Sequence, residues 1–137
     1  MGFVTTKAKN ILQTHILETH YIGLSTTTPT VDGSNISEPG SSTGYERVRI
    51  GELDFATKPG QVANKNIIFF NETLASWGTI THFALYESES ASSPYFWGEL
   101  TEDVTINVSG DNTYVPIFRA HALIIGLDRI ELDTNYG

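Results

Sequence analysis

Residues 77–87, WGTITHFALYE, are the most strand-like run of the chain, because apolar side chains occupy both of its faces. Side chains alternate between the two faces of a strand. Strict alternation sorts six of them into two sets, which are Trp77, Phe83 and Leu85 on one face and Ile80, Ala84 and Tyr86 on the other. Neither face of such a strand is stable in water, so the pattern predicts a central strand that the rest of the chain covers.

Shorter runs with alternating apolar residues predict further strands on both sides of the central one. These runs lie at residues 21–25, 45–50, 53–57, 67–70, 95–100, 104–108, 114–118 and 120–127. Residues 67–70 (IIFF) are apolar at every position, so we expect this strand to be buried on both faces. Pro116 has no amide hydrogen to donate, which predicts that its strand lies at a sheet edge or at a bulge.

The number and spacing of these strands predict the fold class. Eight or nine short strands separated by turn residues favour an all-β fold, namely an antiparallel β-sandwich of the jelly-roll kind. A parallel sheet would need helices between its strands, and helical periodicity appears only at residues 7–17. Thr5 or Thr6 can cap this short N-terminal α-helix, which we expect to dock on the domain or on a neighbouring subunit.

The length of the chain suits one domain with a substantial core, and we interpret residues 1–137 as a single β-sandwich domain. Residues 1–19 are predicted to form an N-terminal arm that carries the helix. Residues 128–137 are mostly polar and are predicted to be a C-terminal tail, held in place only by a neighbouring molecule.

Residues 27–44 are rich in Thr, Ser, Gly and Pro, and only Val31 and Ile36 among them are large and apolar. This composition predicts one long loop. A connection of that length without regular structure is uncommon in a compact domain, and it usually serves as a binding loop or a mobile arm. The alternative is a surface loop without a partner, and the composition alone leaves both interpretations open.

Six polar residues in or near this loop are candidates for binding a partner, because burial in the core does not explain them. They are Thr28, Asp32, Ser34, Asn35, Arg47 and Arg49. Arg47 and Arg49 share one face of the predicted strand at residues 45–50. They suit an acidic partner surface, although arginines in an acidic chain also pair with the carboxylates of the chain itself.

The negative net charge of the chain disfavours nucleic acid as a partner. Eight basic and sixteen acidic residues give a net charge of −8 and a pI near 4.8, so we expect no binding to nucleic acid. We also expect no membrane insertion, because no apolar run is long enough to span a bilayer, and no signal-directed export. The absence of cysteine excludes disulfides and fits a protein made in a reducing cytoplasm.

The sequence predicts no catalytic, cofactor-binding or metal site. The four histidines, His15, His20, His82 and His121, lack the spacing of a metal site, and no nucleotide-binding or nucleophile motif is present. Paired carboxylates such as Glu102 and Asp103, or Glu87 and Glu89, could serve as the acid pair of a glycan hydrolase or bind calcium, but they lack the spaced ligands and the glycine of a calcium loop. The large aromatic residues could line a carbohydrate groove, but a sandwich core needs them, and core is the preferred interpretation for Trp77, Phe83, Phe96 and Trp97.

Three segments taken in order resemble a known family. They are HYIGLSTTTPTVDGSNISEPGSSTGYERV (residues 20–48), WGTITHFALYESES (residues 77–90) and FWGELTEDVTINVSGDNTYVPIFRAHALIIGLD (residues 96–128). The resemblance is to small phage virion proteins that are often labelled tail fibre proteins. It covers residues 10–128 and depends on the order and spacing of Tyr45, Arg47, Trp77, Gly78, Phe83 and Gly98.

The resemblance implies a non-enzymatic structural protein of the virion, assembled in the host cytoplasm. A fibre shaft needs repeats or a long coiled coil, and the chain shows neither. We therefore expect a capsid decoration (cement) protein that binds the outer surface of the head, with other copies of itself, as in a trimer, and the phage major capsid protein as partners. The alternative is a tail fibre, adaptor or tip component that binds other tail proteins and takes part in host attachment. A cell-wall hydrolase using Glu102 and Asp103 is the third hypothesis.

Overall fold

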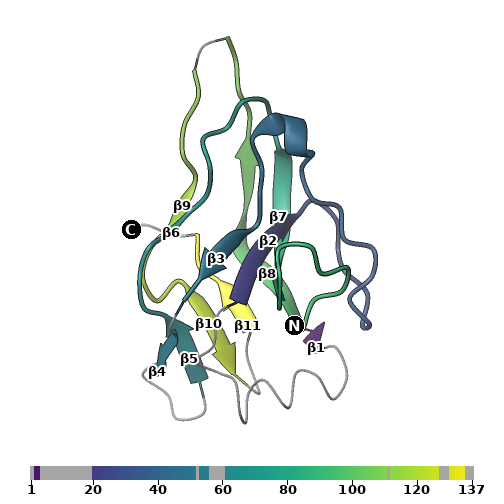
Figure 1. The fold of residues 1–137 in the computed structure, drawn as a ribbon, viewed down its shortest axis with the longest axis vertical. Coiled ribbons are helices and arrows are strands. Elements are labelled where there is room, and N and C mark those ends of the chain that lie inside the picture. Colours follow the sequence, from purple (N-terminus) through teal and green to yellow (C-terminus); the bar gives the residue numbers. More distant parts are fainter. Residues whose placement is uncertain are drawn as a thin grey trace.

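The computed structural model describes residues 2–3, 20–51, 53–55, 61–110, 112–126 and 130–134, and strands dominate it (Figure 1). The described strands are β1 (Gly2–Phe3), β2 (His20–Ser25), β3 (Val48–Ile50), β4 (Leu53–Phe55), β5 (Gln61–Asn64), β6 (Ile68–Phe69), β7 (Gly78–Tyr86), β8 (Phe96–Ile106), β9 (Ile117–Phe118), β10 (Leu123–Gly126) and β11 (Ile130–Leu132). One short 3-10 helix, η2 (Ser41–Thr43), interrupts the long loop. The all-β prediction is confirmed. The helix predicted at residues 7–17 lies outside the described residues.

Nine of the described strands form one sheet in the order β3-β2-β7-β8-β11-β10-β5-β4, with β1 paired to β8. This sheet curves around a single large cluster of buried side chains, to which most of its strands contribute. A second sheet of only two strands, β6 and β9, packs against the same core. The predicted jelly-roll sandwich, which needs two stacked sheets of comparable size, is therefore not confirmed.

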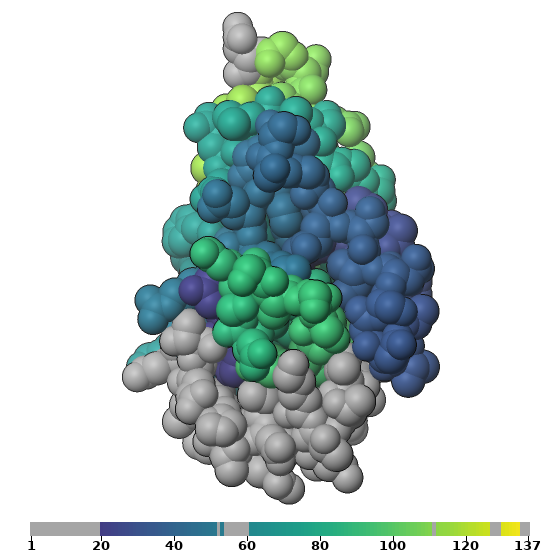
Figure 2. Space-filling view, turned by 45° about the vertical axis from the view of Figure 1, so that its right-hand side comes forward, coloured from purple at the N-terminus to yellow at the C-terminus, as the bar shows by residue number. Residues whose placement is uncertain are grey.

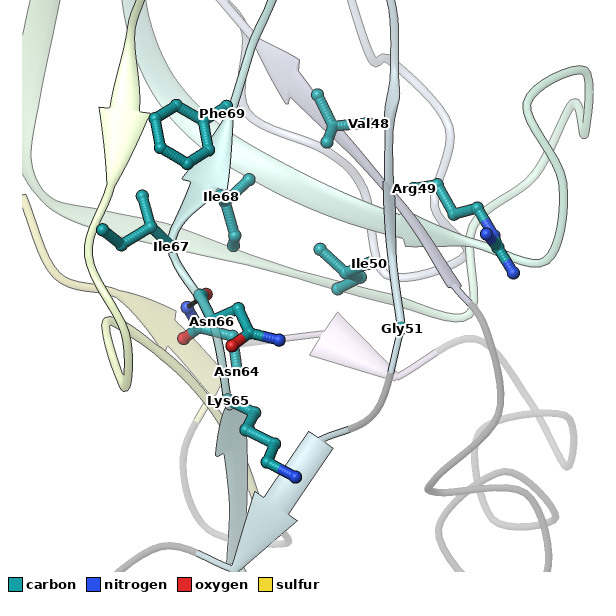
Figure 3. A pocket seen from close by; sticks show the side chains of 10 residues that line it. All are labelled: Val48, Arg49, Ile50, Gly51, Asn64, Lys65, Asn66, Ile67, Ile68 and Phe69. Atoms are coloured by element: carbon teal, nitrogen blue, oxygen red, sulfur yellow. Dashed lines mark hydrogen bonds between the residues drawn. The ribbon is translucent and has the colours of Figure 1, made fainter.

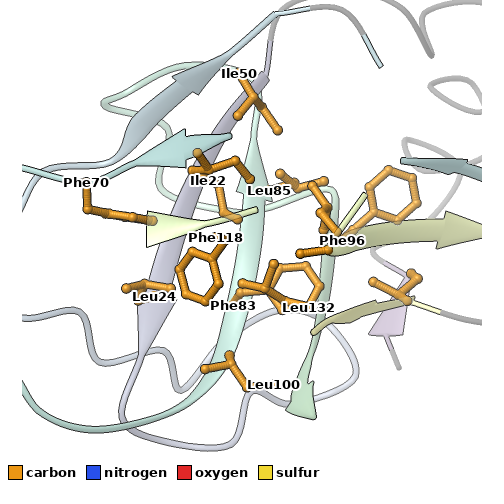
Figure 4. Close-up of a cluster of buried hydrophobic side chains, with 14 of the residues drawn as sticks. Ile22, Leu24, Ile50, Phe70, Phe83, Leu85, Phe96, Leu100, Phe118 and Leu132 are labelled. Atoms are coloured by element: carbon orange, nitrogen blue, oxygen red, sulfur yellow. The ribbon is translucent and has the colours of Figure 1, made fainter. Parts of the chain in front are cut away.

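Strand β7 occupies the central position that the sequence predicts, with β2 on one side and β8 on the other. Phe83 and Leu85 point into the main core (Figure 4). Ala84 and Tyr86 form a smaller cluster with Trp97 on the opposite face. The predicted face of Ile80 is wrong, because a shift in register between Ile80 and His82 places Ile80 in the main core. One extra residue at such a bulge reverses the alternation on its far side.

Strand β8 and the end of the chain also differ from the prediction. The two strands predicted at residues 95–100 and 104–108 merge into the single strand β8. The predicted polar tail is wrong for Ile130–Leu132, which forms β11 between β10 and β8 and pairs with β8 in parallel. Ile130 and Leu132 are both buried, so burial of these two side chains outweighs the polar composition around them.

The two-stranded sheet of β6 and β9 closes the core from one side. Phe70 and Phe118 point inward and pack edge to face, with ring centroids 5.9 Å apart (Figure 4). The expectation that residues 67–70 are buried on both faces is wrong, because Ile67 and Phe69 are exposed. The edge position predicted from Pro116 is confirmed: among the described strands β9 pairs only with β6, and the Pro116 carbonyl accepts a hydrogen bond from Phe70 N–H.

Candidate interaction surface

Two loops lie side by side on one face of the molecule (Figure 2). The first comprises residues 26–47 and connects β2 to β3, in agreement with the predicted long loop; the second comprises residues 87–95 and connects β7 to β8. We call this surface the loop face. Arg47 joins the two loops, because its Nη1 donates hydrogen bonds to the backbone carbonyls of Ser88, Glu89 and Ala91, the last at 2.7 Å.

A compact polar network lies beneath the loop face. Arg47 donates from Nε to Glu38 Oε1 at 2.9 Å and from Nη2 to Glu38 Oε2 at 3.0 Å. Tyr45 donates its hydroxyl hydrogen to the same Glu38 Oε1 at 2.6 Å. The Tyr45 hydroxyl oxygen in turn accepts the backbone N–H of Leu24 in β2 at 2.9 Å. The network therefore fastens the middle of the first loop to the central sheet.

The Arg47 guanidinium also stacks on the aromatic ring of Tyr86. Its central carbon lies 3.4 Å from the centroid of the Tyr86 ring, which is the geometry of a cation–π contact. Gly23 of β2 leaves the space that the network occupies, since a Cβ at this position would come within 2.5 Å of Glu38 Oε1. The side chains of Glu38 and Arg47 keep only 24% and 13% of their exposure, so water screens this ion pair weakly.

The surroundings of these groups shift their proton affinities. Burial raises the pKa of Tyr86 to about 12, and the negative charge of Glu38 adds to the shift. Burial likewise raises the pKa of Tyr45, with the charge and the hydrogen bond of Glu38 acting in the same direction. Burial alone would lower the pKa of Arg47, but the hydrogen bond and charge of Glu38 raise it overall. Tyr45, Arg47 and Tyr86 therefore keep their protons across the neutral pH range.

The tip of the first loop is a tight polar turn. The Asp32 carboxylate accepts hydrogen bonds from the hydroxyls of Thr30 and Ser34 and from the backbone N–H of Ser34. The Thr30 hydrogen bond, followed by those of Ser34, holds the pKa of Asp32 below its usual value. Asn35 adopts a positive φ of 62° and donates from its side chain to the Thr28 carbonyl at 2.9 Å. The tip is thus an exposed but internally bonded structure.

A shallow cleft of about 420 Å³ opens beside the network. Its lining is mainly polar and includes the exposed carboxylates Glu46 and Glu89 together with Ser41 and the edge of the Glu38–Arg47 pair. Exposed hydroxyls and carboxylates at such a cleft can accept and donate hydrogen bonds to a polar partner. The loop face therefore suits a sugar hydroxyl or a polar protein surface better than an apolar ligand.

The structure brings four of the six candidate residues together and separates the other two. Thr28, Asp32, Ser34 and Asn35 share the loop tip. Arg47 is engaged in the internal network, as the alternative of pairing with a carboxylate of the chain itself predicts. Arg49 lies at a second cleft of about 310 Å³ between β3 and residues 64–69, with its side chain directed away from the other lining residues (Figure 3). Whether these six residues bind a partner stays a prediction.

Three members of the network, Glu38, Tyr45 and Tyr86, are absent from the six binding candidates that the sequence indicates. Glu38 lies in the loop and belongs to the EPGSSTGYERV part of the motif that resembles phage virion proteins, so the quoted pattern contains Glu38, Tyr45 and Arg47 together. Their separation along the chain obscures the contact, because no rule of local spacing joins a loop carboxylate to an arginine nine residues later. For Tyr86, the alternation of residues 77–87 predicts only a place in the central strand and no contact with Arg47.

The described residues contain no cluster of side chains typical of a metal centre. Among them, no three His, Cys, Asp or Glu side chains gather as metal ligands. Glu102 and Asp103 are exposed on β8 and line neither of the two clefts. His15 lies outside the described residues. No helix in the described part of the chain has the length and apolar character needed to cross a membrane.

One protein family matches most of the chain. A family model described as Podophage GP4 fiber I protein gp80 matches residues 9–123. The chain belongs to this family. A search of curated proteins found no match. Membership in the fiber I protein family identifies the chain as a structural protein of the phage virion, as the resemblance of its motifs indicates. The matched region contains both loops of the loop face and the complete network of Glu38, Tyr45 and Arg47.

Proposed function

We propose that the protein is a non-enzymatic component of a phage fibre and that its loop face makes the contact with a partner. The observation that carries this proposal is the Glu38–Arg47 network, which fixes two exposed polar loops against the central sheet. Binding residues commonly lie on loops positioned by a rigid scaffold. Loops held in one conformation before binding lose less conformational entropy when a partner binds.

The chemistry of the loop face favours a polar partner. Its tip displays the hydroxyls of Thr30 and Ser34 beside the Asp32 carboxylate, and its cleft displays Glu46 and Glu89. Carboxylates and hydroxyls in this arrangement suit the hydroxyl groups of a surface glycan or the polar surface of another tail protein. The family description, which names a fiber protein, supports the tail as the location.

The test combines location with binding. Cryo-electron microscopy of the parent particle, with gold-labelled antibody against this chain, is expected to place it on fibres of the tail. Phage that carry Asp32→Ala with Ser34→Ala are expected to adsorb to host cells more slowly, because both substitutions remove exposed polar groups of the tip. Asn112→Ala is the matched control, since Asn112 is an exposed polar residue in the turn after β8 and lines neither of the two clefts. Label on the head alone would overturn the proposed location in a fibre. Unchanged adsorption by the tip variant would overturn the loop face as the binding surface.

A capsid decoration protein is the second candidate. It is favoured by the compact described core and by the absence, in the sequence, of repeats or heptads from which a shaft is built. In that role the major capsid protein is the partner, and symmetry multiplies weak contacts over the lattice. The same micrographs separate the two candidates, because decoration predicts label over the whole head. Loss of the chain should then lower the temperature at which heads release DNA without changing adsorption.

A further inference from the structure

An apolar groove of about 330 Å³ opens between the second half of β8 and residues 114–118. Its floor consists of buried side chains of the main core, including Leu24, Leu100 and Phe118 (Figure 4). Val115 and Ile117 belong to its rim and are 46% and 37% exposed. A contiguous apolar surface on a protein commonly marks an interaction site. No described residue that lines the groove belongs to the loop face, so the groove is a separate surface.

A bulge in β8 shapes one side of the groove. Residues 100–103 of β8 have only Thr81 opposite them on β7, so this part of β8 bends out of the ladder. Thr134 fixes the bulge: its backbone N–H donates to Thr101 Oγ1 at 2.9 Å, and its own Oγ1 accepts the backbone N–H of Glu102 at 3.1 Å. Bulges commonly redirect side chains next to functional sites. The direction in which residues 100–103 display their side chains is therefore set by the fold.

The bulge places two exposed carboxylates, those of Glu102 and Asp103, beside the groove. Leu100 and Val104, which flank residues 101–103, both line the groove. Consecutive Cα atoms are about 3.8 Å apart, so the two carboxylates lie close to the rim. Neither carboxylate forms a hydrogen bond or an ion pair with another described residue. Both are therefore available to a partner.

Other charges near the groove leave its surroundings negative. Glu72 adds a third carboxylate near Tyr114, where it accepts a hydrogen bond from the hydroxyl of the adjacent Thr113. Arg119 directly follows β9, but its guanidinium is ion-paired with Asp133 at 3.6 Å and is therefore largely neutralised. The groove is thus an apolar hollow with a negatively charged rim.

We propose that this groove binds a segment of another virion protein in which large apolar side chains alternate with lysine or arginine. An apolar side chain of the partner fills the hollow between β8 and residues 114–118, while its basic groups approach Glu102 and Asp103. Complementary charge of this kind selects the partner and speeds association. A second copy of the chain is a poor occupant, because its net charge of −8 is repelled by an acidic rim. The contact is independent of the loop face, so either proposal can fail without the other.

The first test uses a defined probe, the peptide Ser-Lys-Leu-Lys-Leu-Lys-Ser, which is titrated into the full chain and followed by NMR. Amide signals of residues 104–106 and 114–118 are expected to shift, whereas those of the loop tip at residues 28–35 stay in place. A peptide with glutamate in place of lysine should cause no shifts. A peptide with serine in place of leucine should bind about tenfold more weakly, because it has no apolar side chain to bury.

Three results of this titration would overturn the proposal. The first is an absence of shifts with the lysine–leucine peptide, or shifts of the loop tip alone. The second is equal binding of the glutamate peptide. The third is a change in the signals of residues 104–106 and 114–118 that grows with protein concentration in the absence of peptide, which would make a second copy the occupant.

The second test changes the groove itself. Val115→Ser removes an exposed apolar side chain from the rim, and Asp103→Asn removes one carboxylate; each is expected to weaken binding of the lysine–leucine peptide about fivefold. Glu99→Gln is the matched control for Asp103→Asn and should bind as the wild type does. It removes one charge from an exposed residue of the same strand, whose carboxylate lies on the side of His82, 4.0 Å from Nε2. Circular dichroism verifies folding of the three variants, which the exposure of the substituted side chains predicts. Unchanged affinity in both groove variants, or an equal loss in Glu99→Gln, would contradict the proposed contact.

Discussion

The Arg47 guanidinium binds the Glu38 carboxylate through two parallel hydrogen bonds, from Nε at 2.9 Å and from Nη2 at 3.0 Å. The two residues lie at opposite ends of the second half of the long loop, nine positions apart. The remaining nitrogen of the guanidinium, Nη1, binds carbonyls of the neighbouring loop. The Arg47 side chain therefore connects the two loops. The structure of the loop face depends on the guanidinium, because this planar group donates several hydrogen bonds at once.

Arg47→Lys tests this dependence. Lysine keeps the charge but cannot bind Glu38 through two parallel bonds while also reaching the carbonyls of the second loop. We expect the free energy of unfolding to fall by about 2 kcal/mol, because partners of a half-buried ion pair lose their hydrogen bonds. Urea denaturation measures the change. Arg49→Lys, at an exposed position of β3, is the control and should stay within about 0.5 kcal/mol of the wild type. Equal losses in the two variants would show that the network does not stabilise the fold.

Gly98→Ala tests the insertion of β11 beside β8. A Cβ at Gly98 would lie 2.5 Å from the Ile130 carbonyl oxygen and 2.9 Å from the Phe83 ring, so β11 would have to move away. We expect a loss of about 2 kcal/mol in unfolding free energy, in the range of overpacked cores. Amide hydrogen exchange at residues 130–132 should also accelerate. Gly51→Ala is the matched control, since no atom of the described residues lies within 4 Å of the place that its methyl group would take. Protection of residues 130–132 equal to that of the wild type would contradict this prediction.

Asp32 should titrate below the usual range of an aspartate. Hydrogen bonds from Thr30 and Ser34 stabilise its ionised form and so hold its pKa below 3.8. The contribution of this carboxylate to the order of the tip is therefore present above pH 3.8 and is lost as the pH falls through the lower pKa of the folded state. NMR titration of the carboxyl carbon measures the midpoint. Thr30→Ala should move the midpoint back toward 3.8, whereas Thr28→Ala should not, because Thr28 contributes its backbone carbonyl to the tip.

His82 should make the fold sensitive to mild acid. The side chain is buried against Trp97, and burial lowers its pKa from 6.5 although Glu99 acts in the opposite direction. The unfolded chain therefore binds the proton more readily, so stability is complete above pH 6.5 and declines as the pH falls through the lower pKa of the folded state. We expect His82→Phe to reduce this decline. Urea denaturation at a series of pH values between about 7.5 and about 5 measures it, and parallel curves for the two proteins would contradict the expectation.

The candidate site is predictable in part. The composition of residues 27–44 indicates an exposed loop, and its polar candidates Asp32, Ser34 and Asn35 do share one tip. The partner of Arg47 is not predictable, because the pairing with Glu38 depends on how the loop folds back over β2 and on the space left by Gly23. The exposure of the outer face of β6 and β9 could not be predicted from the sequence IIFF either. A run of apolar residues does not show which face of the strand packs against other segments.

By itself the sequence determined the all-β class, the central position of residues 78–86, the long loop and the family motifs, because period-two alternation and turn residues act locally. Only the tertiary structure decided the bulge that turns Ile80 inward, the parallel insertion of Ile130–Leu132 and the exposure of Phe69. These features depend on contacts between segments that are distant along the chain. Burial against such neighbours is worth more than the local preference of a few residues, and it therefore overrides that preference.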